Sequence, residues 1–300
     1  KQVIYNALSC TVQEGDEVIV PAPYWVSYPD IVKLAGGEPV FVACPPEQGF
    51  RLQAEDLERA ITPRTRWLIL NAPNNPSGAV YDEAGMKALT DVLLRHPQVW
   101  VLTDDIYEHL IYDGRRFFTP AQVEPALKER TLTVNGVSKA YAMTGWRIGF
   151  AGGPAALVNA MVKLQSQSTS NPSSIGQAAA VEALNGPQQV VAERTAVMQQ
   201  RRDRFVTQVS AIEGLSCHSP EGAFYVFPSC AGLIGRQTPA GKRIATDSDL
   251  VLYFLEAQNL AVLQGEAYGV SPYFRMSFAD STETLDEGCR RLRLACAALR

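Results

Sequence analysis

Residues 66–103, RWLILNAPNNPSGAVYDEAGMKALTDVLLRHPQVWVLT, contain the pattern that decides the fold. The segment opens with the apolar run RWLILN at 66–71 and closes with VWVLT at 99–103, and both runs are typical of buried strands. Between them, residues 82–95 have a helical pattern for which Asp82 supplies an N-cap. Two apolar strands joined by a helix predict a βαβ unit in a mostly parallel sheet that helices cover on both faces.

The same alternation continues on both sides of this unit. Strands are predicted at 17–21, 39–43, 131–135 and 146–151, and helices at 2–12, 25–34 and 54–61. The first part of the chain is therefore predicted to be an α/β domain.

The chain changes character after Pro154, where three helical patterns follow one another. The last of them, at 188–212, is long and charged on one side, as expected of a helix that runs between two domains. Beyond it, strands are predicted at 223–227, 260–263 and 274–278, and helices at 248–258 and 282–299. We therefore predict a large cofactor-binding domain at 1–200 and a small α+β domain at 201–300.

The composition is that of a globular protein without a charged binding surface. The 300 residues are 46% hydrophobic and 19% charged, with a net charge of −4. No cluster of Lys and Arg and no apolar run of roughly 18 residues occurs, so neither a nucleic-acid partner nor a membrane span is indicated. Six scattered cysteines and three histidines lack the spacing of a metal site, and unpaired thiols favour a cytoplasmic location.

Polar side chains follow three of the predicted strands where these strands end. They occur at 71–78 (NAPNNPSG), at 104–108 (DDIYE) and at 136–139 (GVSK). Taken singly, each segment has an ordinary explanation: a tight turn, a helix cap and a solvated lysine. Because ligands of doubly wound sheets bind at the carboxyl ends of the strands, the three segments together indicate one binding site.

Five motifs in a fixed order produce a resemblance to a known family. They are PAPYWVSYP at 21–29, NAPNNPSG at 71–78, DDIY at 104–107, Ser138-Lys139 with Arg147 eight residues after the lysine, and YFRMS at 273–277. Over essentially all 300 residues, the chain resembles the aspartate-aminotransferase family of pyridoxal-phosphate enzymes. The resemblance implies the fold type I architecture: a large domain with a mostly parallel sheet of the seven-stranded type, flanked by helices, and a smaller α+β domain.

The resemblance also implies a catalytic set. Lys139 would bind the aldehyde of pyridoxal 5'-phosphate covalently and then act as the general acid and base at the substrate Cα. Asp104 would pair with the protonated pyridine nitrogen. Tyr107 and Asn75 would hydrogen-bond the phenolic oxygen of the cofactor, and Asn75 is expected to contact the substrate as well.

The remaining site residues are expected to hold the ring, the phosphate and the substrate. Trp25 offers a flat face on which the pyridine ring stacks, next to the substrate. Arg147 would bind the phosphate as a charged fork, and the backbone N–H of Lys1 would do so at a helix N-terminus. Ser138 is expected either to contact the phosphate or to stabilise a turn. Arg275 would bind the substrate α-carboxylate through two parallel hydrogen bonds.

A homodimer is implied by the same resemblance, because the sites of this family lie at the subunit interface. Since the sequence begins at Lys1, the N-terminal segment of the family is expected to be absent from it. The polar strip at 165–174, QSQSTSNPSS, is expected to face the partner subunit.

The motifs are most similar to those of the bacterial aspartate/prephenate branch. The expected activity is transfer of an amino group between an L-amino acid, with aspartate favoured, and 2-oxoglutarate by a ping-pong cycle. Aromatic, prephenate or alanine specificity stays open, as does a β-lyase or decarboxylase on the same cofactor. A different class is also open, a ligand-sensing domain of a transcription regulator, which a DNA-binding helix-turn-helix upstream would favour.

Overall fold

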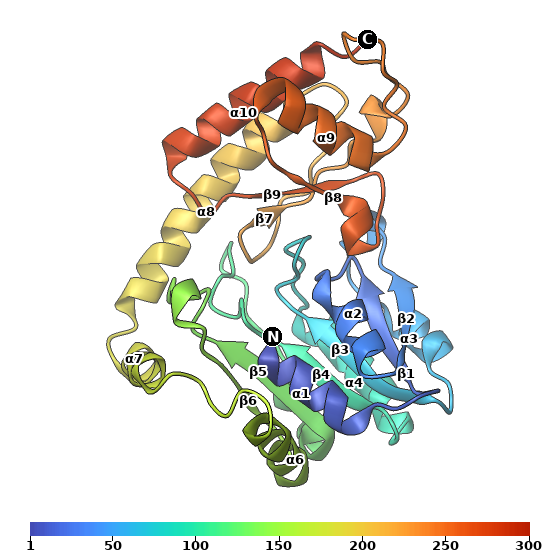
Figure 1. Ribbon diagram of the computed structural model, residues 1–300, viewed down its shortest axis with the longest axis vertical. Coiled ribbons are helices and arrows are strands. Elements are labelled where there is room, and N and C mark those ends of the chain that lie inside the picture. The colour runs from blue at the N-terminus through green and yellow to red at the C-terminus, as the bar shows by residue number, and fades with distance from the viewer.

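A six-stranded sheet forms the centre of the larger part of the molecule in a computed structural model, which describes residues 1–300 (Figure 1). The strand order is β2-β1-β3-β4-β5-β6, and all pairs are parallel except β5 with β6. The strands are β1 (Glu17–Ala22), β2 (Glu38–Ala43), β3 (Thr65–Asn71), β4 (Trp100–Asp104), β5 (Thr131–Gly136) and β6 (Gly149–Gly152). The predicted α/β class and mostly parallel sheet are confirmed.

Two details of that prediction are wrong. The sheet has six strands, one fewer than the seven-stranded type, because residues 1–154 supply no further strand before the chain becomes helical. The strand predicted at 146–151 is shorter and starts later, since Thr144–Trp146 forms a 3₁₀ turn and Arg147 adopts a left-handed conformation with φ 57°. A strand cannot pass through a residue with that φ, so β6 begins only at Gly149.

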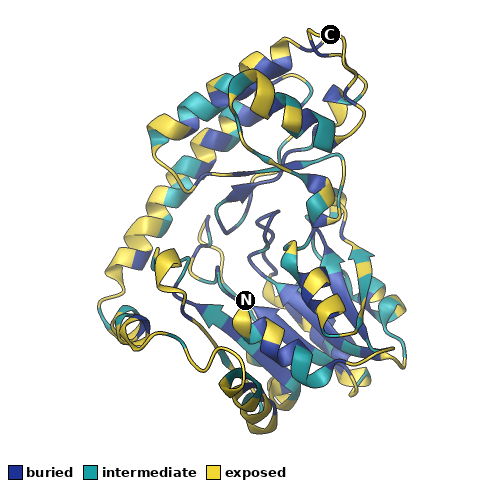
Figure 2. Ribbon diagram, viewed as in Figure 1, coloured by how far each residue is buried: buried dark blue, intermediate teal, exposed yellow.

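Helices cover both faces of the sheet because successive strand side chains point to opposite sides. Val18, Trp67 and Ile69 pack in one apolar cluster with α1 (Gln2–Thr11), α2 (Ser27–Leu34) and α6 (Ala155–Ser166). Ile19 and Leu68 pack in the other with α3 (Ala54–Ala60) and α4 (Glu83–Arg95). Figure 2 shows the inner strands mostly buried between these two layers, whereas the edge strands β2 and β6 are more exposed. A core on each face fixes the sheet, and with it the positions of the strand ends.

The C-terminal part is built on a three-stranded antiparallel sheet in the order β7-β9-β8. After α7 (Ser174–Asn185), the long helix α8 (Gln189–Ser210) leads into it (Figure 1). Its elements are β7 (Tyr225–Val226), α9 (Asp247–Gln258), β8 (Leu263–Gln264), β9 (Phe274–Ser277) and α10 (Thr282–Ala297). An apolar cluster of its own, which includes Phe205, Phe254 and Phe278, lies between this sheet and the helices. The division at residues 200 and 201 stays a prediction, which this separate cluster supports.

A short segment before β7 connects the two parts through backbone hydrogen bonds. The N–H groups of Glu221 and Gly222 donate to the carbonyl of Gly78, and the N–H of Ala223 donates to the carbonyl of Leu110. A Cβ at Gly222 would lie 2.6 Å from Pro73, so this close approach requires glycine. The contact holds β7 directly above the carboxyl ends of the large sheet.

None of the helices combines the length and the hydrophobicity that crossing a membrane requires.

Candidate active site

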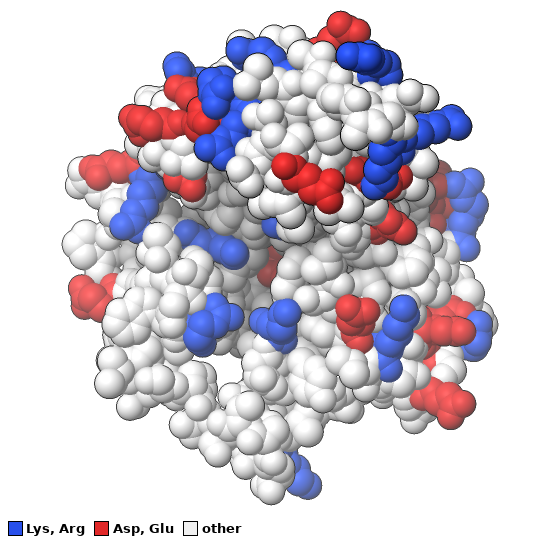
Figure 3. All heavy atoms as spheres, turned by 45° about the horizontal axis from the view of Figure 1, so that its top comes forward, with Lys and Arg blue, Asp and Glu red and all other residues white.

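A cavity of about 730 Å³ lies at the carboxyl ends of the parallel strands, where the C-terminal part covers them. Figure 3 shows a hollow between the two parts, with Lys and Arg atoms around it. All nine residues predicted from the sequence line this cavity: Lys1, Trp25, Asn75, Asp104, Tyr107, Ser138, Lys139, Arg147 and Arg275. The structure therefore brings together side chains that are up to 274 positions apart in the sequence.

Asp104 is the last residue of β4 and is only 7% exposed. Its Oδ2 accepts a hydrogen bond of 2.7 Å from the hydroxyl of Tyr28, and its Oδ1 accepts one of 3.4 Å from the N–H of Ile106. Burial raises the pKa of this carboxyl, and the Tyr28 hydroxyl opposes that shift. A buried carboxylate with one side-chain donor has the capacity to pair with a cationic group that enters the cavity.

Lys139 follows β5 and is half-buried beside two aromatic rings. Its Nζ lies 5.8 Å from the ring centroid of Tyr107 and 5.5 Å from that of Phe224. Burial lowers the pKa of this ammonium, and the nearby positive charge of Arg275 lowers it further. A lysine with a lowered pKa has more free amine near neutral pH, which is the form that attacks a carbonyl.

The loop after β3 places Asn75 in the cavity. The Oδ1 of Asn71 accepts a hydrogen bond of 2.9 Å from the N–H of Asn75, while the Nδ2 of Asn71 donates to the carbonyl of Asp104 at 2.8 Å. The Oδ1 of Asn75 accepts from Nη1 of Arg275 at 3.0 Å. Because the oxygen of the Asn75 amide is used in this way, its NH₂ group is oriented to donate elsewhere in the cavity.

Arg147 and Ser138 lie at the end of the cavity near β6. Nη1 of Arg147 donates to the carbonyl of Thr144 at 2.7 Å, and the rest of its guanidinium is exposed. Gly136, at the end of β5, packs against the backbone that follows Arg147. It has no room for a side chain, since a Cβ there would lie 2.9 Å from the carbonyl oxygen of Ile148. The left-handed Arg147 and this close contact turn the arginine toward the cavity.

Trp25 and Lys1 form the opposite wall. The Nζ of Lys1 lies 4.9 Å from the centre of the Trp25 ring, a cation–π arrangement. The Trp25 ring meets the ring of Tyr28 edge-on, with centroids 5.3 Å apart. One face of a half-buried indole is thereby presented to the cavity.

The charge of the cavity is opposite to that of the whole chain. Four cationic side chains and a single carboxylate line it, although the chain has a net charge of −4. Such a site suits a ligand with several negative charges. A phosphate, one or two carboxylates, an aldehyde and a ring nitrogen each find a group of the right chemistry here, so the residues fit pyridoxal phosphate.

Sequence reasoning missed two tyrosines of the site. Tyr28 donates to Asp104, and Tyr225, on β7, hydrogen-bonds with Tyr107. A signal for Tyr28 is present, because it stands three residues after Trp25, the spacing at which side chains of one helical turn are neighbours. Tyr225 lies in a predicted strand, but its facing residue is more than one hundred positions away, and no local pattern reports that contact.

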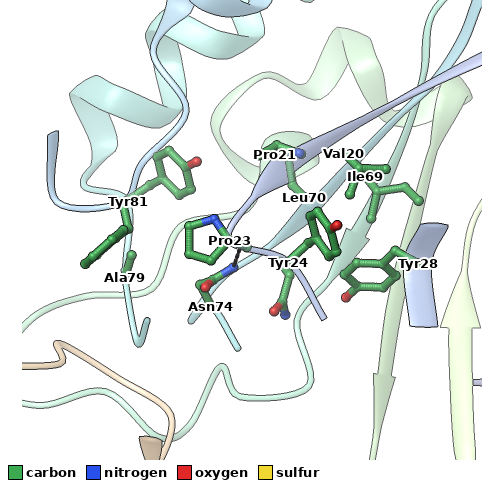
Figure 4. Close-up of a pocket in the computed structure, with 12 residues that line it drawn as sticks. Val20, Pro21, Pro23, Tyr24, Tyr28, Ile69, Leu70, Asn74, Ala79 and Tyr81 are labelled. Carbon is green, nitrogen blue, oxygen red and sulfur yellow. Dashed lines mark hydrogen bonds between the residues drawn. The ribbon is translucent and has the colours of Figure 1, made fainter. Parts of the chain in front are cut away.

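Tyr28 also lines a second, much smaller cavity of about 20 Å³. Figure 4 shows the rings of Tyr24 and Tyr28 in its wall and the hydrogen bond of 3.2 Å from Asn74 to the carbonyl of Pro23. The space is about enough for one water molecule. The side chain of Tyr28, which donates to Asp104, therefore has almost no free space beside it.

The polar strip at 165–174 also reaches the cavity. Gln165, Thr169 and Asn171 are among its lining residues, and Oε1 of Gln165 accepts a hydrogen bond of 2.9 Å from Asn6. Most of the strip is exposed. Its predicted contact with a partner subunit stays a prediction.

Known proteins are similar to this chain over nearly its whole length. The family model for class I and II aminotransferases matches residues 1–292. A protein of Rhizobium meliloti (strain 1021) named aspartate aminotransferase is 59% identical over 299 residues, which cover 100% of this chain and 73% of the relative. A protein of Cereibacter sphaeroides named aspartate/prephenate aminotransferase is 55% identical over 299 residues, covering 100% of this chain and 75% of the relative.

Solved structures agree with these relatives. The crystal structure of the aspartate aminotransferase from Rhizobium meliloti superposes with a TM-score of 0.97 at 59% identity, covering 100% of this chain and 75% of that one. The aspartate aminotransferase from Thermus thermophilus with maleate has a TM-score of 0.88 at 39% identity, covering 98% of this chain and 73% of that one. The predicted fold type I architecture is confirmed by this likeness.

Proposed function

Because the chain belongs to the class I and II aminotransferases, we propose that it transfers the amino group of L-aspartate to 2-oxoglutarate by a ping-pong cycle. The observation that carries this proposal is the single cavity in which Lys139 and Asp104 meet three further cationic side chains. The two relatives named above support aspartate as the amino donor.

Pyridoxal phosphate, the cofactor of this family, supplies an aldehyde that accepts an amine and a protonated ring that withdraws electrons when bound. Lys139 would hold the aldehyde and would also move a proton at the substrate Cα, for which its lowered pKa suits it. Asp104 keeps the proton on the pyridine nitrogen by its negative charge. Tyr107 and the NH₂ of Asn75 would donate to the phenolic oxygen.

The other residues bind and orient. Trp25 would pack on the flat ring, and Arg147, the backbone N–H of Lys1 and Ser138 would hold the phosphate. Arg275 binds the α-carboxylate of the substrate, and Asn75 fixes the plane of its guanidinium through the hydrogen bond of 3.0 Å.

The cations of the cavity also support a dicarboxylic substrate. We assign Arg147 to the phosphate, Arg275 to the α-carboxylate and Lys139 to the aldehyde. The Nζ of Lys1, over the Trp25 ring, is the cation that is left. We propose that it attracts the second carboxylate of aspartate.

A second candidate substrate is prephenate or an aromatic amino acid, because one relative is named aspartate/prephenate aminotransferase. Prephenate also carries two carboxylates, so the same cations suit it. Alanine, with a single carboxylate, leaves one cation without a partner.

We propose a homodimer as the working assembly. Large apolar side chains are exposed on α7 and α6: Ile175 is 72% exposed, Val162 61% and Val181 59%. Exposed apolar side chains on the helices that flank the polar strip at 165–174 are typical of an interface. Light scattering at micromolar concentration checks it, with a mass of two chains expected. The cytoplasmic location stays a proposal, which six unpaired cysteines support.

A half-reaction screen tests the proposed function. The protein is mixed with pyridoxal phosphate and then, one at a time, with aspartate, glutamate, phenylalanine, tyrosine and alanine, while the visible band of the bound cofactor is recorded. Aspartate should convert the band fastest and release one oxo acid per site, and prephenate should reverse the change if it is an amino acceptor. A band that no amino acid converts would contradict the enzyme and favour a ligand sensor.

A further inference from the structure

Tyr225 is the only cavity-lining residue that contacts both a proposed cofactor residue and the proposed carboxylate residue through its own side chain. It lies on β7 and is 6% exposed. Its hydroxyl oxygen is 3.0 Å from that of Tyr107, and its ring centre is 4.4 Å from the guanidinium carbon of Arg275.

The hydroxyl contact controls where the proton of Tyr107 points. Two phenols that share one hydrogen bond leave a single proton for a second acceptor. If Tyr225 donates to Tyr107, the proton of Tyr107 is directed into the cavity, where a phenolic oxygen of the cofactor would accept it. Burial raises the pKa of Tyr107 well above its usual value, so Tyr107 holds that proton at neutral pH.

The ring contact controls the plane of Arg275. A guanidinium packs face-on against aromatic rings, and this packing orients its fork of N–H donors. The ring of Tyr268, 5.2 Å away and 1% exposed, adds a second aromatic contact, and Asn75 accepts one N–H at 3.0 Å. The fork that faces the cavity is thereby held for a carboxylate before any substrate arrives.

We propose that Tyr225 is a positioning residue with two separable actions: its hydroxyl orients the phenol proton of Tyr107, and its ring orients the guanidinium of Arg275. The inference rests on the proposed function and extends it. Tyr225 belongs to the C-terminal sheet, whereas Tyr107 lies in the turn that follows β4 of the large sheet. One side chain therefore links the cofactor end of the site to the carboxylate end.

Two variants separate the two actions. Tyr225→Phe removes the hydroxyl and keeps the ring, and Tyr225→Leu removes both. Tyr268→Phe is the matched control, because it removes the same atom from the other ring that packs on Arg275 but has no contact with Tyr107. All three are loaded with pyridoxal phosphate, and the visible band is titrated with pH.

For Tyr225→Phe, the pH midpoint of the band should rise by about half to one pH unit, because a poorly directed donor stabilises the deprotonated phenolic oxygen less. Its dissociation constant for succinate, a dicarboxylate that does not react, should stay within about twofold of wild type, since the cation–π contact remains. Tyr268→Phe should keep the wild-type midpoint.

Tyr225→Leu should show the same shift in midpoint and, in addition, bind succinate about tenfold more weakly and raise the KM for aspartate by a similar factor. A wild-type midpoint in Tyr225→Phe, or wild-type succinate binding in Tyr225→Leu, would overturn the corresponding action. If Tyr225→Leu is poorly folded, Tyr225→Phe still decides the action of the hydroxyl, because it changes one atom only. Tyr225→Trp, which keeps a ring, then replaces Tyr225→Leu as the test of the ring. Tight succinate binding by Tyr225→Trp supports the action of the ring, and tenfold weaker binding overturns it.

Failure of the proposed function gives a different result. A wild-type protein that forms no visible band with pyridoxal phosphate would overturn both the proposed function and the inference about Tyr225. A wild-type band together with variants that behave like wild type would overturn only the inference about Tyr225.

Discussion

The large sheet and the C-terminal sheet contribute to one cavity in different ways. The large sheet supplies residues at the ends of its own strands, such as Asp104 and Lys139, and two apolar layers hold these strand ends in place. The C-terminal sheet supplies Tyr225 and Arg275 from strands of two and four residues. The difference indicates a division of work, with bond-changing chemistry on the rigid large sheet and substrate binding on the smaller unit above it.

The largest effect is expected at the strand end of β4. Asp104→Ala should leave pyridoxal phosphate bound but lower kcat for aspartate by about a thousandfold or more, because the ring nitrogen loses its counter-charge. The measurement is steady-state kinetics together with the visible spectrum. Asp82→Ala, which removes the N-cap of α4, a helix that packs on the large sheet, is the control and should keep wild-type kcat. A kcat near wild type in Asp104→Ala would remove this residue from the chemistry.

The neighbouring carboxyl tests how rigidly the large sheet is built. Asp105 is 2% exposed and accepts hydrogen bonds from Thr103 at 2.5 Å and Thr119 at 2.9 Å. Burial raises its pKa to about 7 from 3.8. Its contribution to stability is therefore complete below pH 3.8 and is lost as the pH rises through 7, a change on the order of 4 kcal/mol.

Asp105→Asn cannot titrate, so its free energy of unfolding relative to wild type should improve between pH 4 and pH 8. Denaturant unfolding across that range measures this difference. Asp30→Asn, an exposed change on α2, serves as the control and should run parallel to wild type. Parallel curves for Asp105→Asn and wild type would show that this buried carboxyl does not titrate in the range.

The C-terminal sheet should affect substrate binding and not the cofactor. Arg275→Lys replaces a fork with a point charge, and kcat/KM for aspartate should fall about a hundredfold, mostly through KM. The visible band should be unchanged. Arg290→Lys, on the exposed face of α10, is the control. Loss of the cofactor from Arg275→Lys, with KM unchanged, would mean that Arg275 and Arg147 have exchanged roles.

The smallest effect is expected at the junction between the two units. Arg202 on α8 is 3% exposed and donates to both carboxylate oxygens of Asp113, at 2.6 and 2.7 Å, and to the carbonyl of Pro220 at 3.1 Å. Arg202→Met should lower the free energy of unfolding by about 2 kcal/mol, since Asp113 stays half-exposed and is solvated after the change. Thermal unfolding checks it, with the exposed Arg204→Met as the control. An unchanged melting temperature would show that the backbone contacts at Gly78 suffice.

The sequence predicts the large sheet well because its strands are continuous apolar runs separated by helices with clear ends. Five of its six strands lie within one or two residues of their predicted ranges. The exception is β6, where the pattern WRIGFA reads as a strand but the left-handed Arg147 interrupts it. The C-terminal strands are shorter than predicted, since strands of a small sheet end where the chain turns toward its helices.

Two kinds of sequence signal predict the site. The strand ends indicated a binding site from physical reasoning, but the roles of Lys1, Trp25 and Arg275 came only with the resemblance to a family. No local pattern reports contacts such as Tyr107 with Tyr225, because these depend on how two sheets meet. Residues that act by contact across the two units are therefore found from the structure.

The covalent attachment at Lys139 is tested most directly by the visible spectrum before reduction together with peptide mapping by mass spectrometry after borohydride reduction. Wild-type protein loaded with pyridoxal phosphate and treated with borohydride should keep the cofactor on a single peptide that contains Lys139, whereas Lys139→Ala should lose both the visible band and the label. Label on another lysine, or an unchanged band in Lys139→Ala, would contradict the account.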